Sequence, residues 1–444
     1  MKLSGWGRYP QADCAVITPR RATELGGMLP EGRLIARGMG RAYGDSALNI
    51  AATIDMTRLN RLLSFDKSTG LLVAEAGVPL SDIIDVFLPQ GFFPPVTPGT
   101  KHVSLGGMIA ADVHGKNHHN AGTVGNFIDW LDLLGPSGQI VRCSRNENSD
   151  LFEHSIGGMG LTGVILRAAI RLKSVESCWI NQKTIACANL DELFQEFETY
   201  DNSTYSVAWV DCLSSGAGVG RSLLYVGEHA VTDDLPQRLQ SQPLKPPARR
   251  RLSVPFNLPS FTLNRYSVKL FNQLYFHKGQ RAGEGSSGWE LVDYDSYFYP
   301  LDSILHWNRI YGRRGFLQFQ TVLPLAQSRD GIRALLATTA TAGQGSFLSV
   351  LKKFGAQQSA FSFPMEGYTL TLDFPARRGT LALIDKLTEI AIAHGGRFYL
   401  AKDARLTHSE LMTSDKRAAE FKNFRQKHKL DERFASLQSE RLGL

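Results

Sequence analysis

The chain has 444 residues, enough for two or three domains with sizeable cores. Hydrophobic residues make up 43% of it and charged residues 20%, close to the globular average, which excludes a fibrous or wholly disordered protein. Lysine and arginine exceed aspartate and glutamate by 49 to 42, a formal net charge of +7. This excess is too weak to indicate a nucleic-acid partner. It fits an anionic substrate, a phosphate-bearing cofactor or an acidic membrane surface.

Cysteine usage and hydropathy indicate the compartment. The five cysteines are odd in number and form no CxxC pair, which argues against a disulfide framework or a zinc site. We therefore expect a reducing, cytoplasmic environment. The first residues contain no apolar signal-peptide core, and no run of about 18 apolar residues predicts a membrane span. Attachment to a membrane surface remains an alternative.

The first third of the chain consists of short apolar runs separated by glycine-rich turns. These runs predict strands over residues 33–37, 52–56 and 71–76. The apolar spacing of residues 81–88 predicts a helix that Ser81 caps. Strands and helices follow without a regular strand–helix–strand period, so we predict an α+β fold.

Longer polar and aromatic segments follow from about residue 174. Residues 245–251 form a proline-broken basic run that predicts a mobile loop, and the last forty residues are charged and helical in propensity. The other predicted elements are strands over 205–210, 315–322 and 368–374 and an amphipathic helix over 380–394.

Three glycine-rich segments, 38–44, 99–107 and 158–163, lie in the first part of the chain. The third matches GxGxxG, but a helical pattern precedes it and a strand pattern follows it. A Rossmann loop needs the reverse order, and in the first segment Tyr43 replaces the third glycine. Successive backbone N–H groups in glycine turns can still bind phosphate, whereas tight turns alone are the structural alternative.

The densest polar segment is residues 111–120, which contain His114, His118 and His119 around Lys116. A metal site formed by the three histidines is one alternative, which Lys116 disfavours because it would place a cation among the ligands. A solvated loop is a second. The third is a loop beside a flavin, whose cations would hold an anionic substrate and stabilise negative charge.

The order of these segments resembles that of FAD-linked oxidases of the vanillyl-alcohol-oxidase (PCMH) type. The HGKNHH segment and the later AKD segment make the chain similar to the decaprenylphosphoryl-ribose 2-oxidase family in particular. The shared motifs cover nearly the whole chain: 37–45, 98–100, 106–107, 114–119, 157–163, 307–309, 315–320, Lys352, 354–355, 373–375 and 399–403.

The resemblance implies a two-domain PCMH-type fold. An FAD-binding domain would span residues 1–178 and be completed by 397–444, and a substrate domain on an antiparallel sheet would span 179–396. Some relatives tether FAD through a histidine, and Arg41 stands in that position here, so we expect non-covalent FAD.

The resemblance also implies the reaction. The 2-hydroxyl of a polyprenyl-phosphoryl-β-D-ribose would be oxidised to a ketone, the first half of a 2-epimerisation that supplies an arabinose donor for cell-envelope glycans. A short-chain reductase would complete it. Independently of the resemblance, the cationic 245–251 run predicts a peripheral membrane contact, with a solvated loop as the alternative. The alternatives are an oxidase of a soluble alditol or sugar lactone, and a non-catalytic flavoprotein or lipid-phosphate-binding module.

Site residues follow by matching this sequence to the family motifs. The expected catalytic residues are Lys402, as the base, and His114, which would lie near the flavin ring, and no metal is expected. Thr369 and Thr371 stand where mycobacterial members have asparagine and cysteine. The expected FAD contacts are Arg37, Gly38, Met39, Gly40, Arg41, Ala42, Tyr43, Gly44, Asp45, Ser46, Gly99, Ser104, Leu105, Gly106, Gly107, Ala111, Asp112, Val113, His114, Gly115, Asn117, Val164 and Tyr399. The expected substrate contacts are Lys116, Trp209, Gln318, Gln320, Lys352, Thr369, Thr371 and Lys402.

Overall fold

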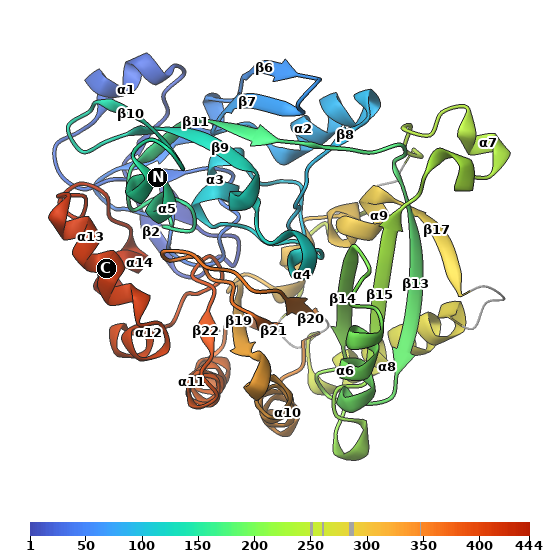
Figure 1. Cartoon of the computed structure of the whole chain (residues 1–444). Coiled ribbons are helices and arrows are strands. Elements are labelled where there is room, and N and C mark those ends of the chain that lie inside the picture. The colour runs from blue at the N-terminus through green and yellow to red at the C-terminus, as the bar shows by residue number, and fades with distance from the viewer. Residues whose placement is uncertain (249–251, 260–261, 284–287, 347) are drawn as a thin grey trace.

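The computed structural model describes residues 1–248, 252–259, 262–283, 288–346 and 348–444 (Figure 1). Two large sheets organise these residues, one of five strands in the order β10-β9-β11-β7-β6 and one of eight in the order β17-β13-β15-β14-β20-β21-β19-β22. Every strand pair within the two sheets is antiparallel. The predicted α+β class with antiparallel sheets is confirmed.

The five-stranded sheet and the loops around it come from the first 171 residues. Its strands are β6 (Leu62–Asp66), β7 (Leu71–Glu75), β9 (Ile128–Leu134), β10 (Ile140–Ser144) and β11 (Val164–Arg171). Helices α2 (Leu80–Phe87) and α3 (Leu105–Ala110) share an apolar core with it, and α5 (Ser149–Ser155) lies beside β10. A small parallel sheet joins β3 (Val16–Ile17), β5 (Thr53–Asp55) and β4 (Ile35–Arg37).

The predicted cap of α2 is wrong. The helix begins at Leu80, so its N-cap is Pro79 and Ser81 lies within the first turn. The Ser81 hydroxyl donates to the Asp82 carboxylate at 3.1 Å instead of accepting from the backbone. Proline suits this position because its fixed φ is compatible with a helix start.

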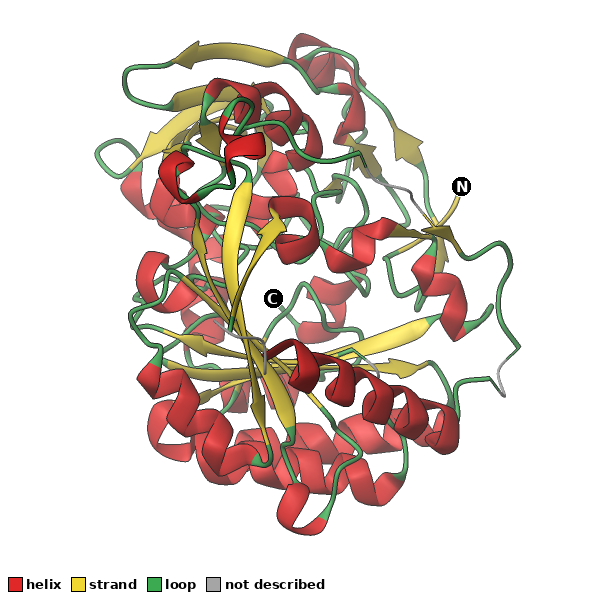
Figure 2. Cartoon of the chain, turned by 90° about the vertical axis from the view of Figure 1, so that its right-hand side faces the viewer, coloured by secondary structure: helices red, strands yellow, loops and turns green. Residues whose placement is uncertain are grey.

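The eight-stranded sheet carries most of the remaining chain. Helices α6 (Leu190–Thr199), α10 (Leu325–Ala342) and α11 (Arg378–Ala393) cover one of its faces, as Figure 2 shows at the bottom of the molecule. Its strands are β13 (Trp179–Cys187), β14 (Tyr205–Val210), β15 (Ser222–His229), β17 (Trp289–Asp293), β19 (Phe316–Pro324), β20 (Ser349–Phe354), β21 (Gly367–Pro375) and β22 (Arg397–Phe398).

Side chains alternate between the two faces of β19, β21 and β20. Leu317, Leu370 and Leu351 pack beneath the helices in the largest core cluster. Their neighbours in sequence, such as Gln318 and Thr371, therefore point to the opposite face, because successive side chains of a strand alternate. This opposite face carries the polar residues that build the site below.

The C-terminal helices return to the first half of the chain. α12 (His408–Ser414), α13 (Arg417–Lys427) and α14 (Leu437–Leu442) lie beside the N-terminal strands in Figure 1. Leu34 donates its backbone N–H to Arg433 at 2.8 Å, and Phe434 packs in the core around β5 and β11. The domain limits at residues 178 and 396 stay a prediction.

Four predicted elements occur as β14, β19, β21 and α11, with ends displaced by at most two residues. Of the predicted loop over 245–251, residues 249–251 lie outside the described residues. None of the helices in the described ranges has the length and apolarity needed to cross a bilayer.

Candidate active site

The 111–119 segment meets the polar face of the eight-stranded sheet at His114. The side-chain amide of Gln320 lies 3.2 Å from His114 Nε2 and donates to Thr369 Oγ1, also at 3.2 Å. The imidazole packs against the rings of Phe354 and Tyr399, with centroids 4.8 and 5.1 Å away. Four segments distant in sequence thus converge on one histidine.

Lys402 lies at the same face, beside the first glycine loop. Its ammonium stands 3.9 Å from the centroid of the Tyr43 ring. The backbone N–H of Tyr43 donates to Ala401 at 2.9 Å, so the two segments are held together by their main chains. Tyr43 therefore supplies one wall against which the lysine lies.

Asp373 is a buried carboxylate next to Lys402 that was not among the predicted site residues. Gln318 donates to its Oδ1, while its Oδ2 has no hydrogen-bond partner among the described residues. Burial raises the pKa of Asp373, and the nearby Lys402 ammonium opposes that rise. The signal in the sequence was the alternation of β21, which places Asp373 on the same face as Thr369 and Thr371.

The pKa values of the three lysines of the site are all lowered, which favours the neutral amine. Burial lowers the pKa of Lys352 to about 8 and that of Lys116 to about 7, where the Lys352 charge contributes. Burial also lowers the pKa of Lys402, which the Asp373 carboxylate opposes and the Lys352 charge reinforces. Since a desolvated ammonium is stabilised by a negative partner, this cluster is suited to an anion or to taking up a proton.

The Lys116 ammonium is held by an aromatic wall that sequence reasoning missed. It donates to the backbone carbonyl of Tyr297 and lies 4.1 Å from the centroid of that ring. Tyr297 belongs to the short helix α9 (Tyr294–Phe298) beside β17. The 111–119 loop is thereby fixed to the β17 edge of the eight-stranded sheet.

His118 has a fixed tautomer. The Gln357 amide nitrogen donates to Asp112 and Thr123, both at 3.2 Å, so its carbonyl oxygen accepts from His118 Nε2 at 2.8 Å. The ring packs on Phe354 with centroids 4.2 Å apart, and burial lowers its pKa to about 4. The described residues contain no group of three or more histidine, cysteine or acidic side chains that could hold a metal.

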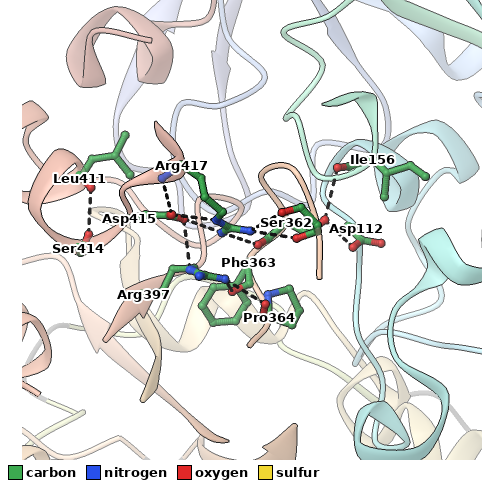
Figure 3. Close-up of polar contacts among 11 residues, drawn as sticks. Asp112, Ile156, Ser362, Phe363, Pro364, Arg397, Leu411, Ser414, Asp415 and Arg417 are labelled. Atoms are coloured by element: carbon green, nitrogen blue, oxygen red, sulfur yellow. Dashed lines mark hydrogen bonds and ion pairs between the residues drawn. The ribbon is translucent and has the colours of Figure 1, made fainter. Parts of the chain in front are cut away.

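A buried network connects the same loop to the C-terminal helices (Figure 3). Asp112 is fully buried and accepts from the Ser362 hydroxyl at 2.6 Å. Arg417 donates to the Ser362 carbonyl at 2.8 Å and pairs with Asp415 at 2.6 Å, and Arg397 pairs with Asp415 at 3.2 Å. Asp415 pairs with both arginines, and hydrogen bonds link these residues through Ser362 to Asp112, so the network braces the loop that carries His114.

The three glycine segments meet around α3. A Cβ on Gly38 would stand 2.0 Å from the hydroxyl of Ser104, which caps α3 by accepting from Gly107. Met159 of the third segment and the preceding Gly157 donate to the last two carbonyls of α3, at 2.8 and 3.0 Å. The sequence predicted the segments, and the structure brings them together.

The comparisons with known proteins bear on this arrangement. Residues 30–144 match the family model of the FAD binding domain. Over its whole length the chain is 35% identical to the decaprenylphosphoryl-β-D-ribose oxidase of Mycolicibacterium smegmatis, of which it covers 97%. The chain belongs to the decaprenylphosphoryl-β-D-ribose oxidase family. The predicted class of FAD-dependent oxidoreductase is thereby confirmed.

Other proteins are less similar to the chain. An uncharacterised protein of Streptomyces coelicolor is 32% identical over 74% of the chain and 90% of its own length. The L-gulonolactone oxidase of Mus musculus is 27% identical over 30% of each chain. The partial match is consistent with a cofactor domain shared among oxidases with different substrates.

The loops of this oxidase fit FAD. Gly99 is exposed and no atom lies within 4 Å of where a Cβ on it would stand, so a ligand can approach its backbone from the solvent side. His114 Nδ1 is buried without a hydrogen-bond partner among the described residues, as expected of a donor meant for a ligand.

Several predicted cofactor residues hold the loops of the oxidase to one another. Arg37 donates to the Ser4 carbonyl at 2.8 Å, Arg41 to the His102 carbonyl at 3.0 Å, and Asn117 to the Pro95 carbonyl at 2.8 Å. Asp45 pairs with Arg441 at 2.8 Å. Tyr399 donates to the Ala111 carbonyl at 3.0 Å. Their contacts with FAD stay predictions.

Two predicted residues lie apart from the cluster. Trp209 is in β14, separated from the Gln320 strand by β21 and β20, and packs against Tyr275 with centroids 4.8 Å apart. Val164 is fully buried in the core around β5 and β11.

Proposed function

We propose that the chain oxidises the 2-hydroxyl of a polyprenyl-phosphoryl-β-D-ribose to the 2-keto sugar, using FAD. The observation that carries the proposal is a cluster of three lysines: Lys352 on the polar face of the sheet, and Lys116 and Lys402 on loops near enough for the Lys352 charge to lower the pKa of each. A sugar phosphate is anionic and rich in hydroxyls, so its phosphate would give the lysine ammonium groups a negatively charged partner. The full-length similarity to a decaprenylphosphoryl-β-D-ribose oxidase supports this substrate class.

Lys402 is the proposed base. A lysine removes a hydroxyl proton only as the neutral amine, and burial beside another cation favours that form. The carboxylate of Asp373 stabilises the ammonium after the proton has moved to Nζ. Bound FAD would accept the hydride from the carbon that bears this hydroxyl.

His114 and Gln320 are proposed to orient the sugar and the ring of the cofactor. Because the Gln320 amide nitrogen faces His114 Nε2 as a donor, the neutral imidazole carries its proton on Nδ1. Burial lowers the pKa of His114 well below its usual value, and the charge of Lys352 contributes, so the ring stays neutral. It can donate from Nδ1 without adding another positive charge.

Lys116 and Lys352 are proposed to hold the phosphate. Tyr297 keeps the Lys116 ammonium in place. Among the described residues, no acidic side chain opposes the lowering of the pKa of Lys116 or Lys352. The proposed division places FAD between the segment 1–178 with 397–444 and the sheet of 179–396. The hydroxyls of Thr369 and Thr371 line the same face.

The deciding experiment is anaerobic incubation of the FAD-loaded protein with a polyprenyl-phosphoryl ribose while the flavin absorbance is followed. Bleaching with this substrate and not with free ribose, alditols or sugar lactones supports the proposal. Bleaching by a soluble alditol or lactone alone would favour that second oxidase activity. Flavin that no sugar reduces would favour a non-catalytic binding module.

The cofactor linkage has a separate test. Arg41 occupies the expected tether position, and a guanidinium forms no bond to flavin, so acid denaturation should release all of the FAD into the supernatant. Absorbance of the supernatant and of the washed precipitate measures this. Flavin retained by the precipitated chain would contradict non-covalent binding.

The proposed product is a keto sugar on a lipid phosphate, so a reductase must act next if the epimer is to form. A short-chain reductase remains the proposed partner, and the test is whether it converts the product only after this oxidase has acted. A membrane contact through the 245–251 run also stays a proposal, for which Lys245 is exposed.

A further inference from the structure

Helix α8 (Arg265–Gly283) presents large apolar side chains to solvent. Its buried residues are Val268, Asn272 and Phe276. The opposite side carries a row that we call the α8 ridge: Tyr266, Leu270 and Leu274, which are 82%, 62% and 62% exposed. Residues four apart lie on one face of a helix, so the three form a continuous strip. Such a strip, unlike single exposed leucines, marks an interaction surface.

The charges of α8 are of one sign. Between residues 265 and 283 there is no aspartate or glutamate, and the four arginines and lysines, Arg265, Lys269, Lys278 and Arg281, are all exposed. An apolar strip flanked by cations is typical of helices that lie in the surface of an anionic bilayer. A second copy of the same face would bring like charges together, which disfavours self-association.

Helix α8 lies on the same face of the large sheet as the candidate site. Paired residues of neighbouring strands share a face, and one such row runs across five strands: Gln320, Thr371, Val350, Trp209 and Leu223. Its last two members form a core cluster with Phe276 of α8. From Val350 onward the row is apolar, so an apolar strip leads from the polar site to the helix.

We propose that the α8 ridge docks on an anionic phospholipid bilayer, with its three apolar side chains among the acyl chains and its cations at the headgroups. The purpose of this docking rests on the proposed function: a polyprenyl tail would stay in the bilayer while the sugar phosphate reaches the lysines. The docking itself is a property of the surface and is tested without substrate.

The test is co-sedimentation of the FAD-loaded protein with vesicles of equimolar phosphatidylcholine and phosphatidylglycerol. Replacing Leu270 and Leu274 together by serine should weaken the partition constant by about tenfold or more, because two half-inserted leucines are lost. The matched control replaces Leu63 and Ile140 by serine, which are 43% and 52% exposed on the five-stranded sheet. This control should bind as the wild type does, and added salt or pure phosphatidylcholine should weaken binding.

Two results would overturn the proposal. One is equal vesicle binding by the α8 and control variants, with flavin content and unfolding midpoint unchanged in both. The other is a wild type that ignores vesicles but forms dimers that the α8 variant does not, which would make the ridge an interface between copies.

A separate assay distinguishes this failure from failure of the proposed function. With a short-tailed polyprenyl-phosphoryl ribose in solution, the α8 variant should reduce its flavin as fast as the wild type does. With the long-tailed substrate in vesicles, it should be slower. If neither protein reduces its flavin with either substrate, the proposed function falls and the vesicle-binding result still stands.

Discussion

The two faces of β19, β21 and β20 belong to the same strands but differ in the polarity and the packing of their side chains. One face packs leucine and phenylalanine against α10 and α11, and the buried members include Leu370 and Phe374. The other carries Gln320, Thr371 and Lys352, and burial lowers the pKa of Lys352 to about 8. Adjacent residues thus serve opposite purposes, since apolar burial stabilises the fold and desolvated polar groups oppose it.

The apolar face of the sheet stabilises the strands on which the polar site is built. Burying Lys352 and Asp373 is unfavourable, and the helix-covered face of the same sheet offsets that cost. Substitutions on the apolar face should therefore change stability, and substitutions on the polar face should change chemistry. The predictions below test this separation, beginning with the largest effect.

Replacing Lys402 by alanine should reduce the limiting rate of flavin reduction by about 10²–10⁴-fold, the usual loss for a general base. Folding and FAD content should persist because the glycine loops are unchanged. Rapid mixing at saturating substrate measures the rate. Lys353→Ala is the control, since Lys353 pairs with Glu198 on the opposite face of β20. A Lys402→Ala rate within about threefold of wild type would mean that Lys402 is not the base.

Replacing Leu370 by alanine should lower the free energy of unfolding by about 2–5 kcal/mol, as large cavities in cores do. Leu370 is fully buried beneath the helices, so the limiting rate of flavin reduction should remain near that of the wild type. Denaturant titration of the FAD-free protein measures the first quantity. Its neighbour Thr371 provides the comparison: Thr371→Ala should leave the stability nearly unchanged. Equal losses from the two substitutions would contradict the separation of faces.

Replacing Lys352 by methionine should weaken substrate binding by about 10–100-fold, because a charge-assisted hydrogen bond to phosphate is lost. The saturated rate should change little if the lysine binds the phosphate and takes no part in proton transfer. Steady-state assays of KM and kcat separate the two effects. Lys353→Met, on the other face, should alter neither, and a pure kcat defect in Lys352→Met would argue against a phosphate-binding role.

The smallest effect is expected from Asp373→Asn on the pH profile. The limiting rate should rise with pH and then level off, because only the neutral amine of Lys402 accepts a proton. The Asp373 charge raises the pKa of Lys402, so its removal lowers that pKa and should move the midpoint to lower pH by about one unit. The pH dependence of single-turnover reduction measures the shift. An unmoved midpoint would mean that Lys402 does not set the profile.

The sequence was sufficient where the signal was local. The β-type runs over 315–322 and 368–374 predicted β19 and β21, and the resemblance of the glycine segments and the 114–119 segment to FAD-linked oxidases pointed to the cofactor. The alternation of β21 also placed Asp373 on the polar face, but its partner Lys402 comes from a separate segment. Gln357 and Tyr297 were missed because each meets the 111–119 loop from a distant part of the chain. The Pro79 cap of α2 was missed because serine is a more common N-cap residue than proline, and Ser81 lies only two positions later.

The contact between Asp45 and Arg441 has a consequence for how this protein is made. The two residues are 396 positions apart, and the first stands in a glycine loop expected to hold FAD. At about 5–20 residues per second, a ribosome needs roughly 20–80 s to reach the second after the first. During that interval the nascent loop lacks its ionic partner and the brace of Figure 3. Stable acquisition of the cofactor should therefore be a late event in biogenesis, and flavin supply in the cell would act on nearly finished chains.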